Sequence, residues 1–396
     1  MNNSSLCTEA GYVSLNKYGE QLCGDRVEQA SNEECSILVL ADGLGSGVKA
    51  NILSTLTSKI ISTMLREGST VDEAVETIAS TLPICKVRKL AYSTFSILEI
   101  FRDGRARLVE YGNPPWIVLR KGKLLELPSA TREIAGKEVR EAAFQMEEGD
   151  TVALMSDGII HAGAGVTINQ GWQWEEAAQY LEECLGKGMS LSRTVLSLMQ
   201  VVDSLYLSEP GDDCTLAMAQ MVPCQPVSLF TGPPSNPAMD RQAVEDWMAS
   251  PGVKVVSGGT TANLVGRVLG KPVETALEPS SDPSIPPIAR IQGVDLVTEG
   301  VLTLNRTVQI LERFRTVTVD GSYQSFKELD AKNGAAMLAR LLLERCTHLY
   351  LFVGQAVNPA HENASLPVDL TIRSRLVKDL SRLMQEMGKT VTIRYY

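Results

Sequence analysis

Three clusters of acidic residues and glycine stand where apolar runs begin or end in the first half of the chain. The clusters are Asp42-Gly43, Asp157-Gly158 and Gly211-Asp212-Asp213, and the adjoining apolar runs are residues 37–40, 151–155 and 215–219. One such cluster alone indicates no more than a turn. A carboxylate beside apolar strands needs water, a hydrogen-bond donor or a cation, and several converging carboxylates form an oxygen site suited to magnesium or manganese. The three clusters together therefore favour a metal site at strand ends, with simple turns as the alternative.

Two further motifs stand in a fixed order with these clusters. Cys23-Gly24-Asp25 precedes them, Gly112-Asn113-Pro114-Pro115 lies between the first and the second, and the first cluster continues as Leu44-Gly45-Ser46-Gly47. This ordered set resembles the metal-dependent protein phosphatases of the type 2C superfamily (PPM), and within it the bacterial branch typified by the stage II sporulation protein E phosphatase. The resemblance covers roughly residues 8 to 222, just over half of the chain.

The periodicity of the chain predicts two domains. Up to about residue 225, strand-like runs alternate with pairs of amphipathic helices, an order that suits an α+β domain with a β-sandwich flanked by helix pairs. Proline-rich segments near residues 223–237 interrupt regular structure. Beyond them, strands and helices alternate, which predicts an α/β layered domain with a partly parallel sheet. We therefore expect domains at residues 1–225 and 226–396, the second with a sensory, regulatory or partner-binding role.

The first predicted helix, residues 48–65, has a regular apolar stripe. Ile52, Leu56, Ile60 and Met64 recur at intervals of four residues. The resemblance implies that this helix and the next one, residues 69–82, move to complete the metal site. The alternative is that the stripe is an ordinary core face.

The resemblance assigns the metal ligands residue by residue. Asp42 would bridge two Mn²⁺ or Mg²⁺ ions in each site, and the carbonyl of Gly43 would bind one of them. Asp157 and Asp212 would complete the shell of the other ion and, with Asp42, form the catalytic set. Asp25 would add a ligand directly or through water, with a turn carboxylate as the alternative. Asp213 would orient a ligand or touch a third ion, with a solvated neighbour as the alternative.

Phosphate binding and proton donation are less clearly marked in the sequence. Arg26 and Lys49 are the candidate substrate-binding cations, although side chains alternate along a strand and Arg26 can point away from Asp25. Many eukaryotic relatives carry a histidine two residues after the first metal-binding aspartate, and here that residue is Leu44. The general acid is therefore unassigned, with a metal-bound water as the candidate. His161 is interpreted as a surface or turn residue.

The second domain contains one glycine-rich turn that opens a predicted helix. Gly258, Gly259, Thr260 and Thr261 follow an apolar strand, and backbone amides at a helix N-terminus can receive an anion. The alternative is that Ser257 or Thr260 simply caps the helix.

Composition limits the remaining classes. The chain has 37 basic and 47 acidic residues and a net charge of −10, which argues against binding nucleic acid through overall charge. The 8 cysteines show no C-x-x-C spacing, so no zinc framework is expected and a reduced, cytoplasmic setting fits. We find neither a signal sequence nor a run long enough for a membrane span.

These expectations combine into one function and one alternative. By resemblance, the protein would be a serine/threonine protein phosphatase of bacterial signalling that uses metal-activated water. Its partner would be a small phosphorylated regulator such as an anti-sigma-factor antagonist, with a small-molecule ligand on the second domain and a homodimer as one option for assembly. The alternative is a catalytically silent scaffold whose second domain binds a small anionic ligand or a partner.

Overall fold

The computed structural model describes residues 6–81, 93–275, 289–315, 327–356 and 368–396. The chain divides into two compact units, Met1–Pro223 and Cys224–Tyr396.

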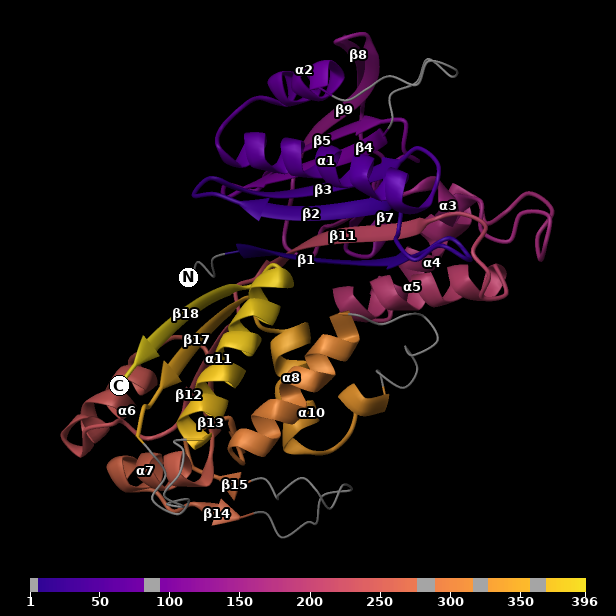
Figure 1. Cartoon of the computed structure of the whole chain (residues 1–396). Coiled ribbons are helices and arrows are strands. Elements are labelled where there is room, and N and C mark those ends of the chain that lie inside the picture. The colour runs from indigo at the N-terminus through magenta and orange to yellow at the C-terminus, as the bar shows by residue number, and fades with distance from the viewer. Residues whose placement is uncertain (1–5, 82–92, 276–288, 316–326, 357–367) are drawn as a thin grey trace. The chain divides into compact units, whose positions relative to one another are not determined.

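The first unit contains two antiparallel sheets (Figure 1). The five-stranded sheet has the order β1-β11-β10-β6-β7, and the six-stranded sheet has the order β2-β3-β4-β5-β9-β8. The strands of the first sheet are β1 (Leu6–Leu15), β6 (Ile117–Arg120), β7 (Lys123–Leu124), β10 (Thr151–Met155) and β11 (Cys214–Pro223). Those of the second are β2 (Asp25–Ser31), β3 (Cys35–Gly43), β4 (Ser93–Phe101), β5 (Arg105–Tyr111), β8 (Ala130–Ile134) and β9 (Lys137–Gln145).

The two sheets share a core between them. Leu38 and Leu40 of β3 belong to the same buried cluster as Val152 and Leu154 of β10 and Ala217 of β11. Because side chains alternate along a strand, every second residue of β3 faces the opposite side. Those residues belong to a separate buried cluster with the helices. The unit is therefore a β-sandwich.

Helix pairs cover both outer faces of the sandwich (Figure 1). Helices α1 (Gly47–Arg66) and α2 (Val71–Thr81) pack on the six-stranded sheet. Helices α4 (Trp174–Gly186) and α5 (Leu191–Leu205) contact β1, β7 and β11 of the other sheet. This arrangement confirms the fold class predicted for the first domain.

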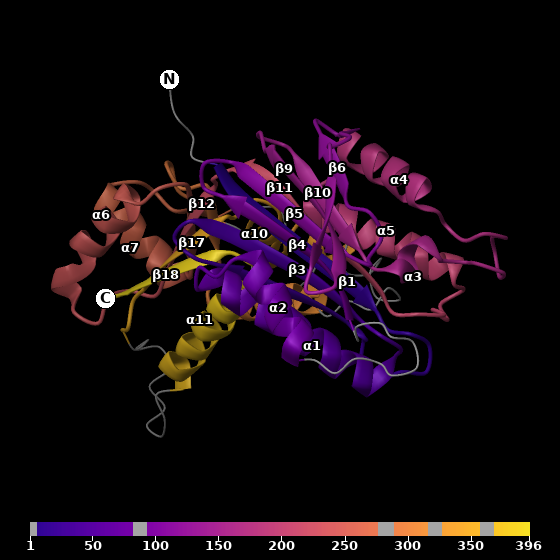
Figure 2. The same ribbon diagram turned by 90° about the horizontal axis from the view of Figure 1, so that it is seen from above.

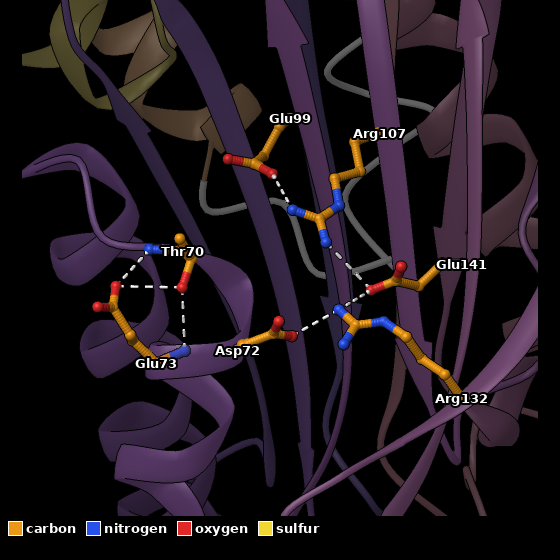
Figure 3. A network of polar contacts seen from close by, with 7 residues as sticks. All are labelled: Thr70, Asp72, Glu73, Glu99, Arg107, Arg132 and Glu141. Carbon is orange, nitrogen blue, oxygen red and sulfur yellow. Dashed lines mark hydrogen bonds and ion pairs between the residues drawn. The ribbon is translucent and has the colours of Figure 1, made fainter.

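Polar contacts fasten α2 to the sheet beside it (Figure 3). Arg107 of β5 lies 3.9 Å from Glu99 of β4 and 3.2 Å from Glu141 of β9. Arg132 of β8 joins Glu141 at 2.7 Å to Asp72 of α2 at 2.5 Å. Since these groups are partly solvent-exposed, each pair contributes at most about 1 kcal/mol. The network fixes the position of α2 more than it stabilises the fold.

Helix α2 starts with reciprocal hydrogen bonds between Thr70 and Glu73 (Figure 3). The backbone N–H of Thr70 donates to Glu73 Oε2 at 2.8 Å, and the N–H of Glu73 donates to Thr70 Oγ1 at 3.2 Å. This capping box satisfies two N–H groups that have no partner within the helix. It explains why the second helix begins where the sequence predicts.

Helix α1 faces the sheet with a different side from the expected core face. Ile52 and Leu56 are exposed, although Ile60 and Met64 are half-buried. The buried residues of α1 are Gly47, Ala50, Leu53, Ser54, Thr57, Ser58, Ile61, Ser62 and Leu65. The helix thus lays a row of mostly small residues on the sheet, because small side chains let the helix approach closely. The interpretation of the apolar stripe as a core face is wrong for its first half.

The second unit is built on one seven-stranded sheet of order β14-β15-β16-β13-β12-β17-β18. Its strands from β16 to β18 are parallel, and β14 and β15 pair antiparallel. They are β12 (Pro226–Thr231), β13 (Val253–Ser257), β14 (Glu274–Thr275), β15 (Ala289–Arg290), β16 (Leu296–Thr298), β17 (His348–Val353) and β18 (Thr390–Tyr395).

Helices cover both faces of this sheet (Figures 1 and 2). Trp247 and Val265 on one side belong to a buried cluster with Phe230, Val256 and Phe352 of the strands. The helices on that side are α6 (Asp240–Ala249) and α7 (Gly259–Leu269), and those on the other are α8 (Val301–Arg315), α10 (Gly334–Glu344) and α11 (Val368–Glu386). Parallel strands joined by helices confirm the layered α/β fold that the alternating sequence predicts.

Two expectations drawn from composition can be compared with the structure. Cys23, Cys35, Cys184, Cys214 and Cys346 are free thiols, whereas Cys7 and Cys224 are disulfide-bonded and so depart from a fully reduced set. Among the described residues, no helix combines the length and the apolar character that a membrane span needs.

Candidate metal-binding and catalytic site

Three of the predicted carboxylates, Asp25, Asp42 and Asp213, continue the core-facing rows of β2, β3 and β11 at one end of the sandwich. Asp42 follows the core residues Leu38 and Leu40 along β3, and Asp25 lies directly opposite Asp42 in the β2–β3 register. Asp213 directly precedes β11 and is in phase with the core residue Ala217 of that strand. Since side chains two residues apart share a face, these carboxyl groups are directed into the space between the sheets. The apolar core therefore ends in a group of acids.

Ser156 joins the two sheets within this group. Its hydroxyl donates a hydrogen bond to Asp25 Oδ2 at 2.7 Å and accepts one from the backbone N–H of Thr215 at 2.8 Å. Its own N–H donates to the carbonyl of Thr215 at 3.0 Å. All these bonds are buried, so Ser156 holds one oxygen of Asp25 in a fixed direction.

Glycines allow the acidic segments to lie in contact. A Cβ atom on Gly24 would lie 2.6 Å from Asp213 Oδ2, and one on Gly158 would lie 2.2 Å from the carbonyl oxygen of Asp213. Tyr206 donates its hydroxyl to the carbonyl of Gly158 at 2.8 Å. The turn that carries Asp157, at the start of α3 (Asp157–Ile160), is thereby held against the segment that carries Asp213.

Burial and mutual repulsion alter the titration of these acids. Burial, followed by the charges of Asp25, Asp157, Asp212 and Asp213, raises the pKa of Asp42 to about 9. Burial raises the pKa of Asp25 to about 7, against the opposing hydrogen bond from Ser156. Burial also raises the pKa values of Asp157 and Asp213. Several carboxylates in a dry space favour a positive charge among them.

Two carboxylate oxygen atoms of this group bear on whether a cation fits among the acids. Asp25 Oδ1 and Asp213 Oδ2 are buried and have no hydrogen-bond partner. A buried carboxylate oxygen without a partner is unfavourable, and an oxygen-binding divalent cation would satisfy it. Within the described ranges, no three or more His, Cys, Asp or Glu side chains lie close enough together to hold a metal ion as they stand. The donor chemistry fits a hard cation.

Gly43 supports this site by contact with α1. A Cβ atom there would lie 2.2 Å from the carbonyl oxygen of Ala50, and the N–H of Gly43 donates to the carbonyl of Gly24 at 3.1 Å. Gly43→Ala should therefore displace the start of α1 and lower the free energy of unfolding by about 1–3 kcal/mol or more. Urea unfolding followed by circular dichroism measures the change.

The matched control for Gly43→Ala is Gly186→Ala. Gly186 ends α4, and a Cβ atom there would meet no atom within 4 Å. This substitution should leave the free energy of unfolding within about 0.5 kcal/mol of that of the wild type. Equal effects of both substitutions would show that the contact between Gly43 and Ala50 has no special importance.

The two predicted phosphate-binding cations differ in their placement. Arg26 Nε contacts Glu28 Oε1 at 3.1 Å, and Glu28 also binds Lys59 of α1 at 2.7 Å. Arg26 thus lies on the α1 side of β2, opposite Asp25, and the structure does not support it as a phosphate ligand. Lys49 is exposed in the first turn of α1, and its role stays a prediction.

The sequence did not reveal the roles of Ser156, Thr215 and Tyr206. Ser156 stands directly before Asp157, so its place in the motif was visible. Its hydrogen bond to Asp25 depends on how the two sheets pack, and a local sequence pattern cannot predict that packing.

The glycine-rich turn of the second unit lies between β13 and α7. The N-cap is Gly258, with φ of 120°, and no side chain caps the helix. Ser257 instead donates its hydroxyl to the carbonyl of Glu299 at 2.8 Å. The interpretation of Ser257 or Thr260 as the cap is therefore wrong, since the conformation open to glycine forms the turn.

An anion at residues 258–261 stays a prediction, and two contacts weigh against it. The hydroxyl of Thr261 is buried and accepts a hydrogen bond from the N–H of Gly232 at 2.8 Å. A Cβ atom on Gly259 would lie 3.9 Å from Glu299 Oε1. A carboxylate so close to the helix start already complements the positive end of the helix dipole and would repel a second anion there.

Comparisons with known proteins agree with the motifs of the first unit. Residues 32–222 match the family model of Stage II sporulation protein E (SpoIIE). The Stage II sporulation protein E of Bacillus subtilis (strain 168) is 26% identical over 167 residues, which are 41% of this chain and 19% of that protein. The protein of the same name from Priestia megaterium is 24% identical over 176 residues, which are 42% of this chain and 30% of that one.

The chain thus spans less than a third of the length of these curated relatives. Among solved structures, the PP2C phosphatase domain of SpoIIE from Bacillus subtilis, with a fragment of its regulatory domain, has a TM-score of 0.46 and 21% identity. That similarity covers 55% of this chain and 64% of the other. The match of residues 32–222 to this family model and the order of the motifs agree with the resemblance to the stage II sporulation protein E family that the sequence indicates.

Proposed function

We propose that the first unit is a metal-dependent phosphatase that hydrolyses phosphoserine or phosphothreonine on a regulatory protein. The observation that carries this proposal is the group of acids between the sheets, with Asp25 Oδ1 and Asp213 Oδ2 buried and unpartnered. A structural role would leave these atoms hydrogen-bonded, because unpaired buried polar groups are unfavourable. A site that binds cations accounts for both oxygens.

The ligand set of this proposal consists of residues from four strand ends. Asp42 and the carbonyl of Gly43 would hold two Mn²⁺ or Mg²⁺ ions together with Asp157 and Asp212, and Asp25 and Asp213 would support them. Such ions supply a nucleophile from water at neutral pH and neutralise phosphoryl oxygens. The chain itself orients the set, since Ser156 fixes one oxygen of Asp25.

The partner and setting are part of the same proposal. The match to the Stage II sporulation protein E family model supports a phosphorylated regulatory protein in bacterial signalling, such as an anti-sigma-factor antagonist, and a cytoplasmic location. A catalytically silent scaffold fits less well, because it would retain buried, mutually repelling carboxylates without using them.

The test is an assay of the full chain on a phosphoserine peptide. We expect release of phosphate with added MnCl₂ and none with EDTA. A buffer exchange that restores manganese after EDTA should restore the rate, which separates metal removal from denaturation. Absence of hydrolysis with either manganese or magnesium, for phosphoserine and phosphothreonine peptides alike, would leave the scaffold as the better description.

A further inference from the structure

Ser156 follows strand β10 and uses its side chain where a strand normally uses its backbone. Its N–H donates to the carbonyl of Thr215 at 3.0 Å, which continues the pairing of Met155 with Leu216. In an antiparallel pair the N–H of Thr215 would return to the carbonyl of Ser156. It donates instead to Ser156 Oγ at 2.8 Å, and the carbonyl accepts the N–H of Ile159 at 3.3 Å. The hydroxyl thus ends the ladder and frees the carbonyl for the first turn of α3.

The bonds of this hydroxyl fix its direction. A serine hydroxyl has one hydrogen, and that of Ser156 goes to Asp25 Oδ2 at 2.7 Å. Its oxygen accepts the N–H of Thr215 at the same time. Ser156 and Thr215 are fully buried, so water does not compete for these bonds. Because Thr215 and Asp25 belong to different sheets, the hydroxyl holds Asp25 in one orientation relative to the opposite sheet.

Asp25 consequently has one oxygen held and one left free. Oδ2 is bonded to Ser156, and Oδ1 is buried without a hydrogen-bond partner. Asp213 repeats this arrangement, since its Oδ1 accepts the N–H of Lys17 at 3.0 Å and its Oδ2 is buried without a partner. A Cβ atom on Gly24 would lie 2.6 Å from that Oδ2, so the free oxygen of Asp213 is next to the segment that carries Asp25.

A buried carboxylate elsewhere in the first unit has both oxygens bonded. Asp150 is fully buried, and Arg120 donates to its Oδ1 at 3.1 Å and to its Oδ2 at 2.7 Å. The N–H of Glu147 also donates to Oδ2 of Asp150, at 2.8 Å. Asp25 differs, because no donor among the described residues reaches its Oδ1. A structural role accounts for Asp150, whereas the half-bonded Asp25 has the arrangement of a metal ligand held by a second residue.

We propose that Ser156 is a positioning residue for the cation site, and that its hydroxyl holds Oδ2 of Asp25 so that Oδ1 stays free for the cation. This inference rests on the proposed phosphatase function and adds to it the residue that sets the affinity for the cation. In this role Ser156 acts only through Asp25. Loss of the hydrogen bond that orients a metal ligand weakens metal binding by about 10–100-fold.

The manganese affinity of the full chain, measured after EDTA treatment and removal of the chelator, tests this role without a substrate. Isothermal titration calorimetry should give Ser156→Ala a dissociation constant about tenfold or more above that of the wild type. Ser156→Thr keeps the hydroxyl and should retain most of the affinity. If circular dichroism shows that the alanine variant is unfolded, Ser156→Cys replaces it, because a thiol is a weaker donor.

The matched control is Ser62→Ala. Ser62 is also buried, and its hydroxyl donates to the carbonyl of Lys59 in its own helix at 3.3 Å. The substitution removes the same group from the same unit without touching an acid of the site. Its manganese affinity should equal that of the wild type.

A double-mutant cycle with Asp25→Asn separates positioning from general damage to the fold. The amide oxygen of an asparagine at this position still accepts the bond from Ser156, but its amide nitrogen is a donor and does not bind a cation. If Ser156 acts through Asp25, adding Ser156→Ala to Asp25→Asn should weaken manganese binding by less than about twofold. An equal loss of affinity in both backgrounds would overturn the proposal.

Kinetics on a phosphoserine peptide distinguish a failure of this proposal from a failure of the phosphatase function. Ser156→Ala should need about tenfold more manganese for its half-maximal rate and approach the wild-type kcat at saturating manganese. If Ser156→Ala binds manganese as the wild type does and the wild type hydrolyses the peptide, the positioning role alone is wrong. If the affinity falls as expected but the wild type hydrolyses nothing, the phosphatase function alone is wrong. A wild type that binds neither manganese nor magnesium overturns both.

Discussion

The variant Asp42→Asn should lose manganese-dependent phosphatase activity and, when metal-free at pH 8, unfold at a higher temperature than the wild type. Burial and four neighbouring carboxylates raise the pKa of Asp42 to about 9, so its charged form is unfavourable in the fold. An amide of the same shape removes that charge. It also removes the proposed bridging ligand, and the rate should fall by more than the ~100-fold that loss of a metal's outer partners can cause.

The opposite signs of these two effects make the test sharp. If Asp42 had a structural role, its substitution would lower the stability of the folded protein. A metal ligand is instead kept in an unfavourable environment for its function, so its substitution raises the stability of the metal-free protein. Activity is measured as phosphate release from a phosphoserine peptide, and stability by thermal unfolding in EDTA. A lower unfolding temperature for Asp42→Asn in EDTA would indicate that Asp42 stabilises the fold and would contradict its role as a strained ligand.

The matched control is Asp103→Asn. Asp103 lies in the exposed hairpin turn between β4 and β5 and binds Arg105 at 2.7 Å. The substitution removes one negative charge from the same unit without touching the acidic site. Both activity and unfolding temperature should stay close to those of the wild type, because exposed ion pairs contribute little to stability.

The apolar run of residues 151–155 was predicted to the residue, since β10 begins and ends with it. The central strand β12 was missed, because Pro226 and the prolines around it read as a break. Proline fixes φ and removes one donor, yet it is tolerated at the first residue of a strand. β9 was missed because its residues are largely charged or small.

The grouping of carboxylates was predictable from the sequence, but its geometry was not. Acidic clusters beside apolar strands pointed to Asp42, Asp157 and Asp213 as converging residues, and the family resemblance added Asp25. The alternation of side chains along a strand indicated that Arg26 can point away from Asp25, and the structure places it on that side. The contact between Ser156 and Asp25 joins two different sheets, and its prediction would require the register between distant segments.

The orientation of α1 shows where periodicity alone misleads. The alternative drawn from its stripe of Ile52, Leu56, Ile60 and Met64 was a core face. The structure instead buries the side that carries Leu53, Ile61 and Leu65 together with Ser54, Ser58 and Ser62. A hydrophobic pattern gives the faces of a helix, but it does not say which face meets the protein's own core and which meets another molecule. That choice depends on how closely the helix must approach the sheet.

The metal-free protein should lose stability as the pH rises from about 5 to about 9. In the folded state the pKa values of Asp25 and Asp42 are about 7 and about 9, above the usual 3.8. At a pH between the usual pKa of 3.8 and these raised pKa values, the folded protein keeps protons that the unfolded chain has already released. Stability then falls with rising pH, because it rises only where the unfolded state binds more protons. Thermal unfolding in EDTA across this range measures the slope.

Manganese should reverse this trend. A cation replaces the protons on the same carboxylates, so its affinity increases with pH and the stabilisation it gives is larger at pH 8 than at pH 6. The double variant Asp25→Asn/Asp42→Asn supplies the control, since it should flatten the slope in EDTA and lose the response to manganese. A slope that persists in the double variant would assign the pH dependence to other groups. A manganese response that persists would place the ion away from β2 and β3, and the ligand set proposed here would be wrong.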